Sequence, residues 1–440
     1  MIGKHELGAA LDRRRVLQGL ATPVLATPVL GLALGFPAGE ALAEAVDAPG
    51  AVLAPWRTGG LDIHHIATGR GDSSLIIGPD GTSLMIDAGA MYGAAPAVLE
   101  PRPGSERRPG QWIARYAARR LHDTGRSGLD YLLVTHLHPD HLGDVSEALP
   151  KAPDGTYRLT GVSDVAAELP IGVILDRGFP DYAYPSAQSA PFALNYMAFI
   201  KSRLAQGGRV ERFRAGAADQ IRALKDPKAF PAFAVRNLAV NGSVWTGRGE
   251  AARSLIPPIG ALKPEDVPDE NAFSAALRLR YGAFAYFAAG DLTSNTLDGE
   301  LPWRDVLTPA ARAAGPVDVA AAAHHGLFDG VSADSVRALR PRVWLIDDWH
   351  VSHPTITTLE RLFSPRLYAG PREVFATRLA AANALVNDRL TRRLASSDGH
   401  VVVRVAPGGA SYTVVVTDNR DEADRVLKTF GPYRSASGAS

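Results

Sequence analysis

Three histidines and an aspartate stand together directly after an apolar run, at His136, His138, Asp140 and His141. Imidazole and carboxylate side chains are ligands for zinc, manganese or iron. The apolar run Leu129–Thr135 predicts a buried strand, whose end would fix the backbone while the following turn lets these side chains converge. With 12 histidines in 440 residues, such a cluster would arise by accident on the order of one time in a thousand or less. The pattern therefore predicts a metal site.

The elements that must position this cluster can be traced from hydrophobic pattern and turn residues. Strands are expected at Leu61–Ala67, Ser74–Gly78, Ser83–Asp87, Leu129–Thr135, Ile171–Leu175, Phe233–Val240, Phe273–Arg280, Phe284–Ala289, Asp318–Ala323 and Val343–Ile346. Helical patterns fall at Gln111–His122, Ser332–Leu339 and Thr355–Phe363, and a late hairpin is expected at Val401–Val405 and Ser411–Val416. This order of elements, with strands first and alternating strands and helices after them, predicts two sheets packed face to face with helices outside.

The N-terminal residues read as an export signal rather than as part of the fold. Arg13 and Arg14 resemble a twin-arginine motif, and a weakly apolar run 19–36 and small residues at 41–43 follow. We therefore expect a signal peptide over 1–43 and a periplasmic or secreted protein. The alternative is an uncleaved membrane anchor, which the prolines in the apolar run disfavour. The hydrolytic domain is expected over 44–417, followed by a polar, frayed tail over 418–440.

Residues from about 177 to 230 interrupt the rhythm of strands with a helix-like, aromatic-rich insertion. Such a segment could form a lid or one wall of a substrate cleft. It could equally be a structural cap that covers the edge of a sheet.

Composition limits the possible chemistry. The chain has no cysteine, which excludes disulfides, thiolate ligands and cysteine nucleophiles. A net charge of +1 gives no bulk attraction to nucleic acid or membranes. Seven arginines lie within residues 101–126. They predict either a solvated helix face or a patch that attracts phosphate.

Several segments, in this order, resemble the metallo-β-lactamase superfamily, and more particularly the hydrolase domain of ComEC-type competence proteins. They are Thr68–Ile77 with its Gly-Arg-Gly-Asp run, Asp87-Ala88-Gly89, Asn271–Ser274, Ala289-Gly290-Asp291, Ala323-His324-His325-Gly326 and Ser352-His353-Pro354. The resemblance runs from about Leu61 to Phe363. It implies a four-layer αββα sandwich with a metal centre at one edge, between the sheets.

The resemblance also implies two divalent cations, zinc as the first choice and manganese or iron as alternatives. Site one would take His136 and His138, and site two Asp140 and His141. The remaining ligands would be the bridging Asp291 and, at site two, His324.

A further site-one ligand is expected between these motifs, where many members of the superfamily have a histidine. Residues 142–290 contain no histidine. We expect Asp176, at the end of a predicted strand, to take the place of this histidine as a ligand. The alternative is that Asp176 is a plain aspartate in a turn. Asp87 is expected to orient the metal-binding loop through hydrogen bonds.

Three residues are assigned to catalysis rather than to metal binding alone. They are Asp140, His325, as a substrate contact or an orienting group for His324, and His353, as a proton donor to the leaving group or a contact to a phosphate oxygen. Core or surface roles are expected for His64, His65 and His350. Leu327 and Ser352 stand where the family usually has serine and glycine, so contacts to the substrate at these two positions are expected to differ from the family's.

The expected activity is hydrolysis of a phosphodiester or related ester by a hydroxide that two metal ions generate. The substrate would be a small molecule or a nucleic acid. No stable protein partner and no membrane span after signal cleavage are expected. A β-lactamase or a lactonase is the enzymatic alternative, and a non-catalytic metal-binding accessory protein of DNA uptake is the alternative outside enzymes.

Overall fold

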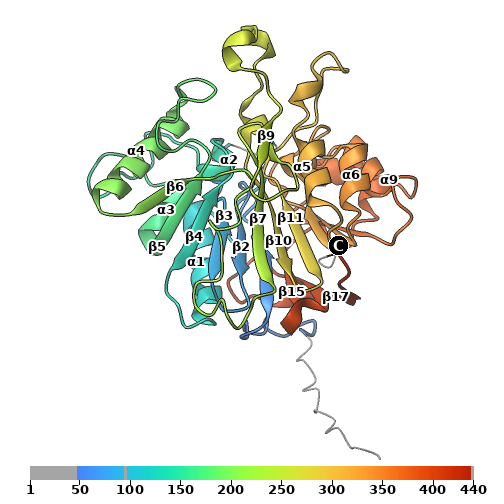
Figure 1. Cartoon of the computed structure of the whole chain (residues 1–440). Helices are drawn as coiled ribbons and strands as arrows, with labels where there is room; N and C mark the ends of the chain where they lie inside the picture. The colour runs from blue at the N-terminus through green and yellow to red at the C-terminus, as the bar shows by residue number, and fades with distance from the viewer. Residues whose placement is uncertain (1–46, 94–96, 438–440) are drawn as a thin grey trace, which may run out of the picture. The chain divides into compact units, whose positions relative to one another are not determined.

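The computed structural model describes residues 47–93 and 97–437 (Figure 1), so the predicted signal peptide lies outside the described residues. Contacts divide the chain into residues 1–44 and 45–440, and only the second unit is described below. Among the described helices, none is both long and apolar enough to cross a membrane.

The first sheet carries the N-terminal strands and the C-terminal end of the chain. Its strands, in spatial order, are β17 (Val426–Arg434), β16 (Ser411–Thr417), β15 (His400–Val405), β1 (Leu61–His65), β2 (Ser74–Ile77), β3 (Ser83–Ile86), β4 (Leu129–Val134), β5 (Ile171–Asp176) and β6 (Arg209–Arg212). Strands β3 to β6 run parallel to one another, and the others pair antiparallel.

The second sheet is built from the middle of the chain. Its strands, in spatial order, are β14 (Glu373–Ala376), β13 (Val343–Ile346), β12 (Val319–Ala321), β11 (Phe284–Ala288), β10 (Ala276–Tyr281), β7 (Phe233–Val240), β8 (Ser243–Trp245) and β9 (Ala252–Ser254). Strands β11 to β14 are parallel. Their carboxyl ends therefore meet at one edge of this sheet.

Helices cover the outer face of each sheet (Figure 1). The α-helices are α1 (Pro109–His122), α2 (Pro139–Leu142), α3 (Gly161–Glu168), α4 (Pro191–Ala205), α5 (Leu307–Ala314), α6 (Ala333–Leu339), α7 (Ile356–Leu362), α8 (Ala381–Val386) and α9 (Asp388–Thr391). Short 3-10 turns are η1 (Ile259–Ala261), η2 (Pro264–Asp266), η3 (Glu270–Phe273), η4 (Pro302–Arg304), η5 (His324–Gly326) and η6 (Pro407–Gly409).

Three apolar clusters hold the layers together. The central one joins both sheets and contains Ile63 and Leu133 from the first sheet and Leu277 and Tyr286 from the second. The second cluster packs α5, α6 and α7 on the outer face of the second sheet. The third packs α1, α3 and α4 on the outer face of the first. This is the predicted αββα sandwich of the metallo-β-lactamase type, and the fold prediction is confirmed.

Two predictions about the chain's organisation need correction. Residues after Thr417 are not a frayed tail, because β17 pairs with β16 and forms the edge of the first sheet. The segment 177–230 is not wholly an insertion, because β6 extends the parallel part of that sheet beside β5. Both strands were missed because their exposed, polar residues alternate too weakly to predict a strand.

Candidate metal centre

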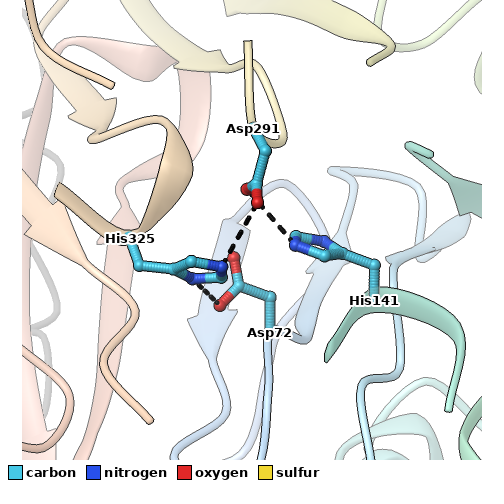
Figure 2. A group of neighbouring side chains, drawn as sticks. All are labelled: Asp72, His141, Asp291 and His325. Atoms are coloured by element: carbon cyan, nitrogen blue, oxygen red, sulfur yellow. Dashed lines mark hydrogen bonds and ion pairs between the residues drawn. The ribbon is translucent and has the colours of Figure 1, made fainter. Parts of the chain in front are cut away.

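Most of the predicted metal-binding residues come together where strands of both sheets end. His136 follows β4 by two residues, Asp291 follows β11, and His324 and His325 follow β12. Figure 2 shows His141, Asp291 and His325 pointing toward one another, together with Asp72, which precedes β2. One potential ligand atom of each of these four residues lies within 4.8 Å of the others.

Four imidazoles direct Nε2 toward the buried carboxylate of Asp291. His141 Nε2 lies 3.2 Å from Asp291 Oδ1. The distances to Asp291 Oδ2 are 3.7 Å from His136, 3.3 Å from His325 and 4.0 Å from His324. Such spacings between donor atoms fit ligands that share a cation with bonds of about 2 Å, rather than a set of optimal hydrogen bonds.

Carboxylates on the far side of three imidazoles fix which nitrogen faces Asp291. Nδ1 of His141 donates to Asp87 at 2.8 Å, and Nδ1 of His325 donates to Asp72 at 2.9 Å. Nδ1 of His324 donates to Asp329 at 2.8 Å. In the neutral form with the proton on Nδ1, each Nε2 would offer its lone pair to a cation, which is the usual arrangement around metal-binding histidines.

Asp87 orients the metal-binding loop, as predicted. Besides His141, its carboxylate accepts hydrogen bonds from the amide and the hydroxyl of Thr135, both at 2.7 Å. Thr135 Oγ1 in turn lies 3.1 Å from His136 Nδ1. One aspartate after β3 therefore holds both ends of the loop that carries the histidine cluster.

The residues present fit a bound cation. His141 Nε2 and Asp291 Oδ1 are both buried and have no hydrogen-bond partner. An unpaired buried polar atom normally costs about 1–3 kcal/mol. A divalent cation between the imidazoles and the carboxylate would satisfy both atoms.

The charges of the centre shift its pKa values in opposite directions. Burial alone would lower the pKa of His141, but Asp291, Asp140 and Asp87 outweigh it and raise that pKa well above the usual value. Burial alone would raise the pKa of Asp291, but His141, His325 and His324 hold it well below the usual value. The carboxylate of Asp291 is thus kept ionised, as a ligand must be.

Unusual backbone geometry shapes two sides of the centre. His324 and His325 both have positive φ, 49° and 51°, a conformation that costs a non-glycine residue of order 1–3 kcal/mol. Gly89 lies so close to the loop that a Cβ there would be 1.9 Å from the carbonyl oxygen of Asp140. Asp72 N donates to that same oxygen at 2.8 Å, so the Gly-Arg-Gly-Asp segment is tied directly to the metal-binding loop.

The structure gives the paired histidines different positions from those expected. His325, and not His324, lies against the predicted site-two residues, with Nε2 2.9 Å from Asp140 Oδ2. His324 lies beside Asn271, whose amide nitrogen is 3.2 Å from His324 Nε2. His138 is close to His136, with 3.1 Å between His138 Nδ1 and His136 Nε2.

The structure does not bring Asp176 into the centre as a ligand. Its Oδ1 accepts the amides of Gly178 and Phe179, and its Oδ2 accepts the hydroxyls of Tyr182 and Tyr196. Both oxygens are used to close the turn after β5, so the substitution of Asp176 for the missing histidine is wrong.

His353 lies against the centre in a neutral form. Its ring stacks on that of His325 with centroids 4.6 Å apart, and its Nδ1 is buried without a hydrogen-bond partner. Burial and the charge of His325 hold the pKa of His353 well below the usual value. A neutral imidazole is a poor proton donor at neutral pH, so a contact to a substrate oxygen suits this position better.

His64 and His65 are buried and have the structural roles expected of them. His65 is buried, with Nδ1 2.8 Å from Asp347 and Nε2 3.1 Å from the Tyr286 hydroxyl. His64 is buried with Nδ1 3.0 Å from the hydroxyl of Tyr116.

The arginine-rich segment is largely neutralised within the fold. Its charged groups pair with acidic residues, as Arg108–Asp164, Arg115–Glu422, Arg119–Asp424, Arg120–Asp424 and Arg126–Asp130. The pairs with Glu422 and Asp424 anchor α1 to the residues that precede β17. Because most of its arginines are paired, the segment is not a free phosphate-binding patch.

Sequence reasoning missed four residues that support the centre: Asp72, Asp329, Glu270 and Asn271. Glu270 Oε1 accepts the amide of Leu137, between the first two histidines of the cluster, at 2.8 Å. Asp72 and Asn271 lie in segments on which the family resemblance was based, so their place in those motifs was the available signal. No sequence motif pointed to Asp329, because only folding places it beside His324.

The comparison with sequence models of protein families agrees with the fold. Residues 67–165 match the sequence model of the metallo-beta-lactamase superfamily, a range that includes the whole His136–His141 cluster. A search of curated proteins found no match. Among solved structures, the chain is similar to a new diphosphatase from the PhnP family. That similarity has a TM-score of 0.32 at 10% identity and covers 79% of this chain and 98% of the diphosphatase. The family match and the histidine–aspartate cluster together support a divalent-metal centre in a hydrolase fold.

Proposed function

We propose that this protein is a metal-dependent hydrolase that cleaves phosphodiester or related ester bonds. The observation that carries the proposal is the convergence of four imidazole Nε2 atoms on Asp291, where two buried polar atoms have no hydrogen-bond partner. Bound divalent cations would supply an activated water and positive charge for the attacked group.

The protein's own residues hold this centre in a fixed geometry. The carboxylate of Asp291 lies 3.7 Å from Nε2 of His136, 3.2 Å from Nε2 of His141 and 3.3 Å from Nε2 of His325, so its two oxygens could serve two cations. His136 and His138 would hold one, and Asp140, His141 and His325 the other. Because most of the arginine-rich segment is paired internally, attraction for a phosphate group must come mainly from the cations themselves.

The ComEC-like resemblance favours a phosphodiester over a lactam or lactone, and it is the reason for this choice of substrate class. We further propose that the protein is exported, on the evidence of Arg13, Arg14 and the apolar run after them. The substrate would then be a small molecule or nucleic acid outside the cytoplasm. Zinc is the first cation to test, because the expected ligands are imidazole and carboxylate groups.

Metal analysis combined with two substrates tests the proposal. We expect the purified protein to hold about two equivalents of a divalent metal, to hydrolyse bis(p-nitrophenyl) phosphate and to lose this activity with a chelator. His136→Ala should lower both metal content and activity, whereas His350→Ala, at a histidine outside the centre, should leave both unchanged. Turnover of nitrocefin without phosphodiesterase activity would contradict the proposed substrate class. A metal-loaded protein inert on a broad panel of esters would contradict the proposed enzyme.

A further inference from the structure

A pocket of about 500 Å³ lies between two segments that are far apart in the sequence. One wall is Tyr184, in the loop after β5, and the other is formed by residues 254–259, between β9 and η1. The volume is in the range of pockets that hold small ligands, about 300–1,000 Å³.

The side chains that line this pocket are mainly apolar. They include Leu255, Ile256, two prolines and Ile259, with no charged side chain, and Ser254 and Tyr184 carry the side-chain hydroxyls. A charged group would find no countercharge among these side chains, whereas a flat apolar ring could pack on the tyrosine and proline faces.

The ring of Tyr184 is held in place from behind. It meets Phe273 edge to face, with centroids 5.4 Å apart, and Phe273 is fully buried. The backbone carbonyl of Tyr184 accepts a hydrogen bond of 3.0 Å from Arg177. A wall fixed in this way can bind a ring without first having to become ordered.

A buried ion pair connects this wall with the metal centre. Arg177, with only 1% of its side chain exposed, pairs with Glu270. Glu270 Oε1 in turn accepts the amide of Leu137, which stands between His136 and His138. The pocket and the first half of the histidine cluster therefore rest on the same pair of side chains.

A pocket of about 570 Å³ along β6 lacks this connection. It is lined partly by charged residues, of which Arg212 pairs with Asp181 and Arg214 with Asp219. Its charged groups are already satisfied within the fold, so the pocket beside Tyr184 is the better candidate for a substrate group.

We propose that the Tyr184 pocket binds a flat, uncharged ring of the substrate, such as an aryl group or a nucleobase, while the metal centre takes the phosphate. This inference rests on the proposed function. It assigns the substrate as an ester with at least one aromatic substituent, and Tyr184 as a residue that determines specificity.

Two phosphodiesters with the same leaving group test the assignment. Bis(p-nitrophenyl) phosphate has a second ring for the pocket, and methyl p-nitrophenyl phosphate has a methyl group there. Tyr184→Ala should raise KM for the first about tenfold, the loss expected for one ring contact, with little change in kcat. KM for the methyl ester should stay unchanged, and Tyr184→Phe should behave as the wild type. An equal effect on both esters, or none on either, would overturn the assignment.

A binding measurement keeps the two proposals apart. Calorimetry with diphenyl phosphate and dimethyl phosphate needs no turnover. We expect Tyr184→Ala to weaken binding of the diphenyl ester about tenfold and not that of the dimethyl ester. If the wild type cleaves neither substrate but this difference is found, the proposed function fails and the pocket assignment stands. If both substrates are cleaved and the difference is absent, the pocket assignment fails alone.

Discussion

The turn after β5 and the turn after β11 each bury one aspartate, yet the two carboxylates have opposite surroundings. Asp176 is 0% exposed and Asp291 is 1% exposed. Asp176 accepts two amides and two tyrosine hydroxyls, so both of its oxygens are satisfied. Asp291 has one oxygen without a hydrogen bond, and imidazoles surround it.

The difference shows that burial alone does not identify a ligand. Burial raises the pKa of Asp176, despite the hydrogen bonds that oppose it. The pKa of Asp291 moves down instead, because three imidazoles outweigh its burial. A buried carboxylate whose two oxygens both accept hydrogen bonds closes a turn. A buried carboxylate that lies among imidazoles and has one oxygen without a hydrogen bond can bind a cation.

The largest expected effect is that of Asp291→Asn on metal content and activity, with Asp176→Asn as its matched control. Asp291→Asn removes the charge on which the centre converges, so metal content should fall and kcat/KM should drop by more than about a hundredfold, beyond the usual loss from an outer-shell change. Asp176→Asn should keep the metal and the activity. Elemental analysis and kinetics on bis(p-nitrophenyl) phosphate would measure both.

Stability gives a second readout. Asp176→Asn should lower the free energy of unfolding by about 1–3 kcal/mol, because an amide keeps a single acceptor oxygen for the four hydrogen bonds that the carboxyl group accepts. Metal-free Asp291→Asn should also be less stable than the metal-free wild type, because the imidazoles that hold the pKa of Asp291 below its usual value stabilise its carboxylate in the folded chain. Loss of metal in Asp176→Asn with an intact fold would reverse the comparison and restore Asp176 as a ligand.

The sequence predicted the parts of the centre that lie close together along the chain. A compact cluster after an apolar strand needs only the strand to be found, and Leu129–Val134 is an unbroken apolar run apart from Asp130. Asp291, His324 and His325 were predicted from family motifs. The positions of His324 and His325 relative to Asp291 depend on the positive φ of both histidines, which the sequence does not reveal.

The failures share a physical cause. Asp176 was predicted from its place at a strand end, but its partners Tyr182 and Tyr196 come from the segment whose conformation was open. Five strands were missed, β6, β8, β9, β14 and β17. Most residues of β6, β9 and β17 are exposed and pair with a neighbour that the local pattern does not specify. The strands β8 and β14 are only three and four residues long. Long-range partners, rather than local propensity, decided each case.

A smaller effect is expected from the carboxylate behind His141. Asp87→Asn should weaken metal binding about 10- to 100-fold, as removal of a hydrogen-bond partner of a ligating histidine usually does. The bond from His141 Nδ1 and the two from Thr135 would all be altered. Competition with a chromogenic chelator would measure the affinity.

Asp164 offers a control for this variant. It is a buried aspartate that pairs with Arg108 away from the centre. Asp164→Asn should cost stability and leave metal affinity unchanged. Equal losses of affinity in both variants would mean that general destabilisation, rather than orientation of His141, explains the effect of Asp87→Asn.

The smallest expected effect is a dependence of stability on pH at Asp176. Its pKa in the folded protein is raised above the ordinary value of 3.8, so between these two values the folded chain binds more protons than the unfolded chain. The contribution of Asp176 to the free energy of unfolding is therefore full below 3.8 and is lost as the pH rises through the folded pKa.

Asparagine does not titrate, so the difference in unfolding free energy between the wild type and Asp176→Asn should shrink as the pH rises through this interval. Urea denaturation of both proteins in the presence of a chelator would follow it without interference from the metal. If this difference in unfolding free energy grew with pH, the four hydrogen bonds would outweigh burial in their effect on the pKa of Asp176. The carboxylate would then be held as an anion in both turns, and only the partners, not the protonation, would distinguish Asp176 from Asp291.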